Sequence, residues 1–85
     1  MLQVPKLTII MPVYNTAQYL PRAFDALLKQ IDKSFKLIVV DDGSTDNSSD
    51  IIKKYAELDE RITYIYQENA GPARARQNGY RRSRG

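Results

Sequence analysis

The sequence predicts an α/β fold of three layers, in which a parallel sheet carries helices on both faces. Three short apolar segments alternate along the chain with three segments of helical spacing. The first two apolar segments are nearly continuous hydrophobic runs rich in Ile and Val, as in strands that are covered on both faces. Strands that alternate with helices favour right-handed crossovers and therefore a parallel sheet.

The expected strands are the three apolar segments. They read LTIIMPV over residues 7–13, KLIVV over residues 36–40 and ITYIY over residues 62–66. No internal repeat or low-complexity linker divides the chain, so we expect one small domain over residues 1–85.

One expected helix follows each strand. Pro21 suits the first position of the first helix, because proline lacks the N–H group that has no partner there. The apolar stripe of this helix consists of Leu20, Phe24, Leu27, Leu28 and Ile31. The stripe of the second helix consists of Ile51, Ile52, Tyr55 and Ala56. We expect the second helix to open at the capping residues Ser44, Thr45 and Asp46. The third is expected from Gly71 and Pro72 through Arg76 to about residue 82.

The composition limits the chemistry that the chain can perform. With 42% hydrophobic and 27% charged residues, it is typical of a soluble globular domain. It contains neither cysteine nor histidine, which excludes disulfides, thiolate metal sites and imidazole catalysis. Its chemistry must therefore depend on carboxylates, amides, hydroxyls and guanidinium groups. The longest apolar run is too short to span a bilayer and the N-terminus lacks the features of a signal peptide, so we expect a cytoplasmic protein.

The net charge of +3 conceals a basic C-terminal segment. Residues 71–85 contain five arginines and no acidic residue, whereas residues 1–70 contain 8 basic and 10 acidic residues. Such a cluster can attract phosphate, nucleic acid or an anionic membrane surface, but it is also typical of a solvated helix face. Arg74 and Arg76 fall on different faces of the third helix, so we expect only one of them to reach a ligand. For the others we favour a solvated face over a membrane or protein partner: Arg81, Arg82 and Arg84.

Ligands of parallel sheets bind beyond the carboxyl ends of the strands. Here these ends read MPVYN after the first strand, VDDGS after the second and QENAG after the third. Gly71 and Pro72 then open a helix whose free N–H groups and positive dipole end suit a diphosphate. The residues that suggest function therefore gather at one edge of the sheet.

Asp41 and Asp42 end the second strand side by side. Adjacent strand residues point to opposite faces, so one carboxylate can bond the turn near Gly43 and Ser44 while the other faces the crevice. An ionised carboxylate only accepts hydrogen bonds, so it would select a ligand edge that donates one, such as the N3–H of uracil, which cytosine lacks. Tyr14 could stack on such a base. The alternative is purely structural: both aspartates only start the turn and cap the following helix.

Three motifs occur in a fixed order along residues 6–85, reading LTIIMPVYNTAQYL, LIVVDDGSTDNS and QENAGPARARQNG. Together they resemble the N-terminal half of the nucleotide-binding domain of family 2 inverting glycosyltransferases, which have the Rossmann-like GT-A fold. The resemblance implies that Pro12 and Tyr14 flank a nucleobase, that Asp42 binds the uracil edge and that Arg76 lies near the base and the phosphates. Members usually have Arg-Asn where this chain has Arg76-Gln77-Asn78, so the amide contact would fall to Asn78. Supporting candidates at the same edge are Asn15, Asp41, Gly43, Ser44, Gly71 and Asn78.

The resemblance implies an enzyme that transfers a hexosyl or related sugar from a nucleoside-diphosphate sugar, most simply a UDP-sugar, to an acceptor hydroxyl, as in polysaccharide biosynthesis. Such transfer uses Mg²⁺ or Mn²⁺ on carboxylates and a base that activates the acceptor. After Glu68 the chain has no carboxylate, and the acidic DxD motif and the acceptor-binding regions come later in the family. We therefore expect residues 1–85 to belong to a longer enzyme, peripheral at the inner membrane face, and to be inactive and without bound metal on their own.

The resemblance also implies the strand order third, second, first, fourth, which leaves the first strand of this chain as an open hydrophobic edge. Such an edge invites pairing with another chain, so we expect self-association through Leu7 to Val13, or alternatively through the third strand. The alternative function is a non-catalytic nucleotide-binding or self-associating module of the same fold.

Three other classes fit less well. A phosphorelay receiver would need its phosphoacceptor after the third strand, where this chain has Gln67-Glu68-Asn69. A dinucleotide oxidoreductase would need G-x-G-x-x-G after the first strand, and PVYNTA contains no glycine. A nucleic-acid binder is disfavoured because the sequence outside the arginine segment is net acidic and has no recognition motif.

Overall fold

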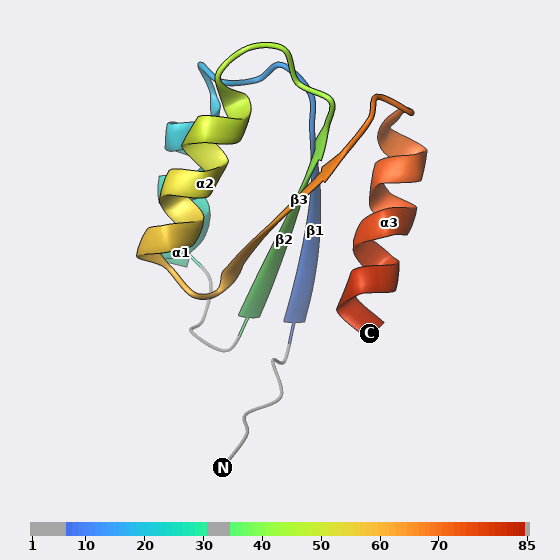
Figure 1. Ribbon diagram of the computed structural model, residues 1–85. Helices are drawn as coiled ribbons and strands as arrows, with labels where there is room; N and C mark the ends of the chain where they lie inside the picture. Colours follow the sequence, from blue (N-terminus) through green and yellow to red (C-terminus); the bar gives the residue numbers. More distant parts are fainter. Residues whose placement is uncertain (1–6, 31–34, 85) are drawn as a thin grey trace.

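The computed structural model describes residues 7–30 and 35–84 of the 85-residue chain (Figure 1). Strands and helices alternate in the order β1 (Leu7–Val13), α1 (Leu20–Gln30), β2 (Phe35–Asp42), α2 (Ser48–Leu58), β3 (Ile62–Gln67) and α3 (Pro72–Arg84). Every strand and helix that the sequence predicts is present. Ile31, expected in the stripe of the first helix, lies outside the described residues.

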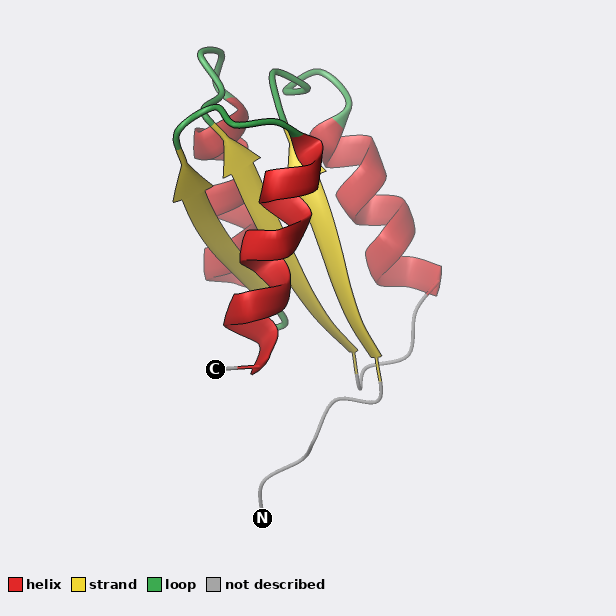
Figure 2. Cartoon of the chain, turned by 90° about the vertical axis from the view of Figure 1, so that its right-hand side faces the viewer, coloured by secondary structure: helices red, strands yellow, loops and turns green. Residues whose placement is uncertain are grey.

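The strands form a parallel sheet in the order β1-β2-β3. The register pairs Val13 of β1 with Asp41 of β2, and Asp42 of β2 with Gln67 of β3. Helices α1 and α2 cover one face of the sheet and α3 covers the other, as Figure 1 and Figure 2 show. The predicted parallel sheet with helices on both faces is therefore confirmed.

The central strand β2 supplies the core of both layers. Leu37 and Val39 pack in the cluster under α1 and α2, and Ile38 and Val40 pack in the cluster under α3. Successive strand residues alternate between faces, and all four of these side chains are at most 1% exposed. Burial on both faces explains why this strand is a continuous apolar run in the sequence.

Small residues bring α3 close to the sheet. A Cβ atom at Gly79 would stand 2.5 Å from Ile10 Cγ2 and 3.2 Å from Val40 Cγ2. One turn earlier in the helix, Ala75 is fully buried in the same cluster as Val40. This close packing fixes the helix axis, and with it the start of α3 at the carboxyl edge of the sheet.

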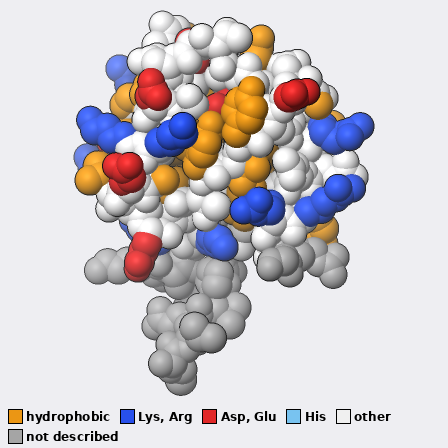
Figure 3. Space-filling model, in the orientation of Figure 1, with side chains coloured by type: hydrophobic (Ala, Val, Ile, Leu, Met, Phe, Trp, Pro, Cys, Tyr) orange, Lys and Arg blue, Asp and Glu red, His pale blue; other side chains and the backbone are white. Residues whose placement is uncertain are grey.

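The outer strands of the described sheet are β1 and β3. In β1, Leu7 is 50% exposed and residues 9–12 are half-buried, so apolar surface stays accessible along this edge, as the sequence predicts. At the other edge Tyr66 is 57% exposed. Figure 3, in the orientation of Figure 1, shows hydrophobic side chains near the middle of the molecule and basic side chains over the helices on either side. Pairing of the chain with a second copy through either edge stays a prediction.

The start of α2 differs from the prediction. The helix begins at Ser48, and Asn47 before it makes no side-chain capping bond. Of the expected caps, Ser44 and Thr45 bond to the loop after β1, which lies beside theirs. Asp46 bonds to that loop and also accepts the N–H of Ser48, the first residue of the helix. The other two helices begin where the sequence predicts or one residue away. Within the described ranges, no helix is long and apolar enough to cross a membrane.

Candidate functional site

The loops that follow the three strands lie together at the carboxyl edge of the sheet (Figure 2). They cover residues 14–19, 43–47 and 68–71. Because β2 lies between the other two strands, the loop after β2 reaches both neighbours. Gly43 has a φ of +74°, and a Cβ atom there would stand 2.7 Å from the backbone N of Asn69, so only glycine suits this position.

Asn15 joins the loops after β1 and β2. Its φ of 50° lies in the left-handed region, which asparagine tolerates better than most residues. Its Oδ1 accepts the backbone N–H groups of Thr45 at 2.7 Å and Asp46 at 3.2 Å, and its own N–H donates to Ser44 Oγ at 3.0 Å. The structure thus brings the predicted residues Asn15 and Ser44 together. They fix the loop that carries Tyr14, whose side chain is 49% exposed.

Asp46 and Ser48 add further bonds between these loops. The N–H of Ala17 donates to Asp46 Oδ2 and that of Thr16 donates to Ser48 Oγ, both at 3.2 Å. Asp46 Oδ1 also accepts the N–H of Ser48 at 2.9 Å. Hydrogen bonding to Ser48 is the main cause that lowers the pKa of Asp46, so this exposed carboxylate stays ionised at neutral pH and keeps its acceptors for the loop.

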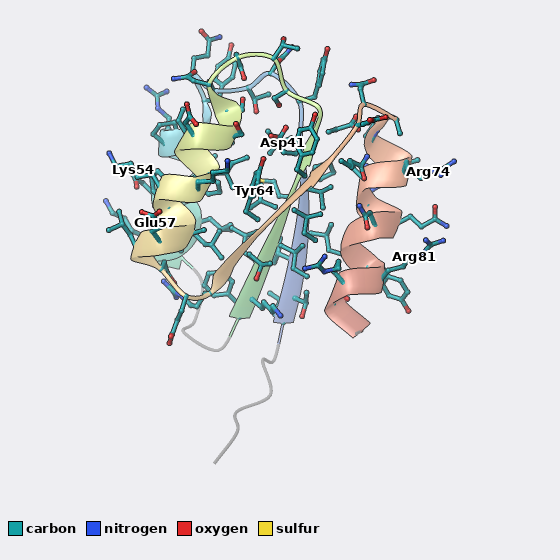
Figure 4. The ribbon with its side chains drawn as sticks, in the orientation of Figure 1. Asp41, Lys54, Glu57, Tyr64, Arg74 and Arg81 are labelled. Atoms are coloured by element: carbon teal, nitrogen blue, oxygen red, sulfur yellow. The ribbon has the colours of Figure 1, made fainter. Side chains whose placement is uncertain are left out.

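Asp41 is the aspartate that bonds the turn. It is 0% exposed, its Oδ1 accepts the N–H of Ser44 at 3.0 Å, and its Oδ2 accepts the hydroxyl of Tyr64 at 3.1 Å. Figure 4 shows Asp41 and Tyr64 close together between the sheet and α2. Burial, followed by the negative charge of Asp41, raises the pKa of Tyr64 to about 12. Asp41 therefore has a structural role on the face that α1 and α2 cover.

Asp42 lies on the opposite face, against the segment that leads into α3. Its Oδ1 accepts Gln67 Nε2 and the N–H of Ala70, both at 2.8 Å. Its Oδ2 accepts the N–H of Gly71 at 3.0 Å and Asn69 Nδ2 at 3.4 Å. The bond from Gln67 is the main cause that holds the pKa of this carboxyl below its ordinary value, while burial opposes it.

These contacts change two expectations from the sequence. Asp42 does face away from Asp41, but it is only 3% exposed and all of its acceptor positions have partners. The N–H of Gly71, at the opening of the helix that the sequence assigned to a diphosphate, already donates to this carboxylate, as does that of Ala70 before it. Neither aspartate caps α2, so the purely structural alternative also fails in its original form. Whether Asp42 binds a base stays a prediction.

Gln67 is a residue whose role sequence reasoning missed. Besides its bond to Asp42, its Oε1 accepts Asn78 Nδ2 at 3.0 Å. Asn78, expected to replace a missing amide contact to ligand, is thus used inside the protein. The sequence position of Gln67 could have indicated this role, because Gln67 ends the third strand as Asp42 ends the second. The register of the two strands pairs these residues.

The remaining predicted residues lie around this centre. Pro12 is half-buried in β1, and Arg76 is exposed on α3 next to the buried Ala75. Figure 4 shows Arg74 and Arg81 projecting from α3 away from the sheet. They border a groove of about 260 Å³ lined by Gln67, Glu68, Ala70, Arg74, Gln77, Asn78 and Arg81. Arg76 does not line this groove, which agrees with the expectation that Arg74 and Arg76 point in different directions.

A family model described as glycosyl transferase family 2 matches residues 8–85. The chain belongs to glycosyl transferase family 2. Glycosyltransferase GlyA of Streptococcus pneumoniae serotype 4 is 48% identical to it over 79 residues, which are 93% of this chain and 11% of that protein. The uncharacterized glycosyltransferase EpsJ of Bacillus subtilis is 38% identical over 82 residues, 96% of this chain and 24% of that protein. This family 2 chain therefore spans a quarter or less of these relatives.

A solved structure confirms the fold of this family 2 glycosyltransferase chain. The mannosyltransferase PcManGT from Pyrobaculum calidifontis, in complex with GDP-Man and Mn²⁺, is similar to it with a TM-score of 0.82 and 28% sequence identity. The match covers 92% of this chain and 24% of the mannosyltransferase chain. The predicted GT-A fold is therefore confirmed.

The described part of this glycosyltransferase chain offers no group of three acidic, histidine or cysteine side chains that could hold a metal ion. Asp41 and Asp42 also have hydrogen-bond partners for their oxygens. These residues do not fit the Mg²⁺ or Mn²⁺ that the family resemblance implies for the full-length enzyme. No chemical step by this chain is therefore assigned to a metal.

Proposed function

We propose that this chain is the nucleotide-binding part of a longer glycosyltransferase that takes its sugar from a UDP-sugar and transfers it with inversion to an acceptor hydroxyl. The observation that carries this proposal is an ionised carboxylate, Asp42, held at the carboxyl edge between the Tyr14 loop and the start of α3. Family membership supports the reaction class. Transfer itself would need residues outside this chain, including any that hold a divalent cation.

The bonding of Asp42 supports base recognition through Oδ2. Both lone pairs of Oδ1 have short partners at 2.8 Å, whereas the contact from Asn69 to Oδ2 is 3.4 Å long. An imide N–H could replace that long contact at little cost, because Asn69 Nδ2 also donates to the backbone oxygen of residue 42 at 3.0 Å. Since the pKa of Asp42 is lowered, the carboxylate is ionised at neutral pH and accepts only. A base with an N–H at this edge is therefore preferred over cytosine.

Tyr14 and Arg76 supply the other contacts in this proposal. Tyr14 presents a half-exposed ring on a loop that Asn15 fixes, so its stacking on a base requires little ordering. Pro12, two residues earlier, flanks the base from the strand. The diphosphate interacts with Arg76 and with the first turn of α3, where the N–H groups of residues 73 and 74 have no helical acceptor.

A second candidate donor is a GDP-sugar. The similar mannosyltransferase was solved with GDP-Man, and guanine also carries a ring N–H donor that a carboxylate can accept. The bonding of Asp42 therefore discriminates against cytidine nucleotides, and the space beside Tyr14 decides between a pyrimidine and a purine. A non-catalytic nucleotide-binding module would share this site and differ only in lacking transfer.

Titration of UDP, GDP and CDP into the purified chain tests the proposal. We expect UDP to bind at least about tenfold more tightly than CDP, the equivalent of one lost hydrogen bond of ~1.4 kcal/mol. Tyr14→Ala should weaken UDP binding by roughly tenfold through lost stacking, while Tyr14→Phe should leave it nearly unchanged. Equal binding of UDP and CDP would refute base-edge selection by Asp42, and binding unaffected by Tyr14→Ala would remove the stacking contact.

A further inference from the structure

A row of side-chain hydrogen bonds connects α3 to the proposed base-binding carboxylate. Asn78 Nδ2 donates to Gln67 Oε1 at 3.0 Å, and Gln67 Nε2 donates to Asp42 Oδ1 at 2.8 Å. The three residues come from α3, β3 and β2, and both amide side chains are half-buried. Partly buried amide groups are costly to leave without partners, so this row has one preferred arrangement.

The chemistry of the groups fixes the direction of these bonds. An ionised carboxylate can only accept, so Gln67 must turn its NH₂ group toward Asp42. Its oxygen then faces α3 and needs a donor, which the NH₂ group of Asn78 provides. A donor at position 78 therefore sets the orientation of the Gln67 amide, and that orientation decides whether Asp42 meets an N–H or an oxygen.

We propose that Asn78 and Gln67 are positioning residues that set the nucleotide specificity of this chain by holding Asp42 with Oδ1 engaged and Oδ2 turned to the base. This inference rests on the proposed function of Asp42 in base recognition. With Gln67 Nε2 and the Ala70 N–H both on Oδ1, the plane of the carboxylate cannot turn away from this orientation without losing two short bonds. Oδ2 then keeps one short bond, from Gly71, and its long contact with Asn69 is the one that an imide N–H replaces.

Reversal of the Gln67 amide would have a defined consequence. Its oxygen would face Asp42 Oδ1, and two oxygens form a hydrogen bond only if one of them carries a proton. The single proton of Asp42 would then be used toward the Gln67 oxygen, and Oδ2 would become an uncharged oxygen that accepts the uracil N3–H less strongly and repels the cytosine N3 lone pair less. Loss of the donor at position 78 should therefore relax the preference for uridine nucleotides rather than abolish binding.

Asn78→Asp is the sharpest test, because aspartate has the same shape but can only accept. It should draw the Gln67 NH₂ group to itself and turn the Gln67 oxygen to Asp42. We expect the ratio of CDP to UDP dissociation constants to fall by about tenfold. We also expect the pKa of Asp42, followed by NMR of its carboxyl carbon, to rise. Asn78→Ala, which removes the donor without adding an acceptor, should shift both quantities in the same direction by less.

Gln77→Ala is the matched control, since it removes the exposed amide of the adjacent residue in the same groove. It should leave the affinity ratio and the pKa of Asp42 unchanged. Glu68, Arg74 and Arg81, which border this groove, are identical in all of these variants, and Asp41 bonds Tyr64 on the other face. Asn78→Asp adds a negative charge that itself raises the pKa of Asp42, so the uncharged Asn78→Ala decides whether the lost donor raises it as well.

The outcomes separate this inference from the proposed function. If the parent chain binds neither UDP nor GDP, the proposed function fails, and an unchanged pKa of Asp42 in the position 78 variants would overturn the positioning role as well. If the parent prefers UDP but folded Asn78→Asp keeps the parental ratio and pKa, only the positioning role is wrong. Should Asn78→Asp not fold, the same comparison between Asn78→Ala and Gln77→Ala decides.

Discussion

At the scale of residues, the two adjacent aspartates have different partners and therefore different roles. Asp41 lies between Tyr64 and the turn at Ser44, on the face covered by α1 and α2. Asp42 gathers N–H groups from Gln67 to Gly71 on the other face. Asp41 thus stabilises the layer beneath α2, and Asp42 fixes the segment that leads into α3. Of the two, only Asp42 is on the side of the proposed ligand.

The pair of Asp41 and Tyr64 predicts a specific loss of stability. Tyr64→Phe should lower the free energy of unfolding at neutral pH by about 1–3 kcal/mol, because buried Asp41 Oδ2 loses its donor. Tyr66→Phe is the control, since Tyr66 is 57% exposed and its change should stay within about 0.5 kcal/mol. Urea denaturation measures both. Equal stability of Tyr64→Phe and the parent chain would contradict the role given to this hydroxyl.

The same pair sets the response to high pH. The folded-state pKa of Tyr64 is about 12, above the ordinary tyrosine value of about 10. The stabilisation is therefore complete below about pH 10 and is lost as the pH rises through the folded value. Burial also raises the pKa of Tyr55, so Tyr55 contributes a loss of stability at high pH that Tyr64→Phe does not remove. Over this window the stability of Tyr64→Phe should fall less than that of the parent, and an equal fall would argue against the pair.

At the scale of elements, α3 is held at its start and along its length. Asp42 bonds the N–H groups that precede its first turn, and Ala75 and Gly79 pack its middle against β1 and β2. The loops after β1 and β2 are joined separately by Asn15 and Asp46. The proposed ligand site therefore lies between two independently fixed parts of the carboxyl edge.

Gly79→Ala tests the close packing of α3. The added Cβ would stand 2.5 Å from Ile10 Cγ2, and such overpacking costs about 1–3 kcal/mol, against a gain of ~1 kcal/mol in helix propensity. We expect net destabilisation of about 1 kcal/mol in urea denaturation. In an Ile10→Ala background, where the opposing side chain is removed, the same substitution should be neutral or stabilising. Gly79→Ala that stabilises both backgrounds equally would contradict this packing.

The helices and strands could be predicted where the local sequence pattern determines them. Contacts with residues distant in the sequence could not. KLIVV is apolar because β2 is buried on both faces, and Pro72 opens α3 because its missing N–H needs no partner. The prediction for the start of α2 was wrong for Ser44 and Thr45, which suit a helix cap and a loop contact equally well and here bond to Asn15. Asp46 does accept the N–H of Ser48 at the start of the helix. The partners of Asp42 were missed for the same reason, since the register of β2 and β3 brings them together.

At the scale of the whole molecule, polar contacts gather at the carboxyl ends of the strands, whereas the two outer strands, β1 and β3, keep exposed hydrophobic side chains such as Leu7 and Tyr66. The accessible surface of β1 agrees with the strand order expected for the GT-A fold, in which a further strand lies beside it. Arg74 and Arg81 of α3 project away from the sheet (Figure 4). In the proposed function the base therefore lies at the loops, and only the diphosphate contacts α3, at Arg76 and the first turn.

The central claim is that Asp42 Oδ2 accepts a hydrogen bond from the base of the bound nucleotide. A structure of the chain with UDP tests it most directly. We expect the uracil N3 atom within about 2.7–3.2 Å of Asp42 Oδ2, with the ring of Tyr14 against the base and Asn69 Nδ2 moved away from that oxygen. A base bound elsewhere, with Asn69 still donating to Asp42 Oδ2 and Tyr14 uncovered, would contradict the account.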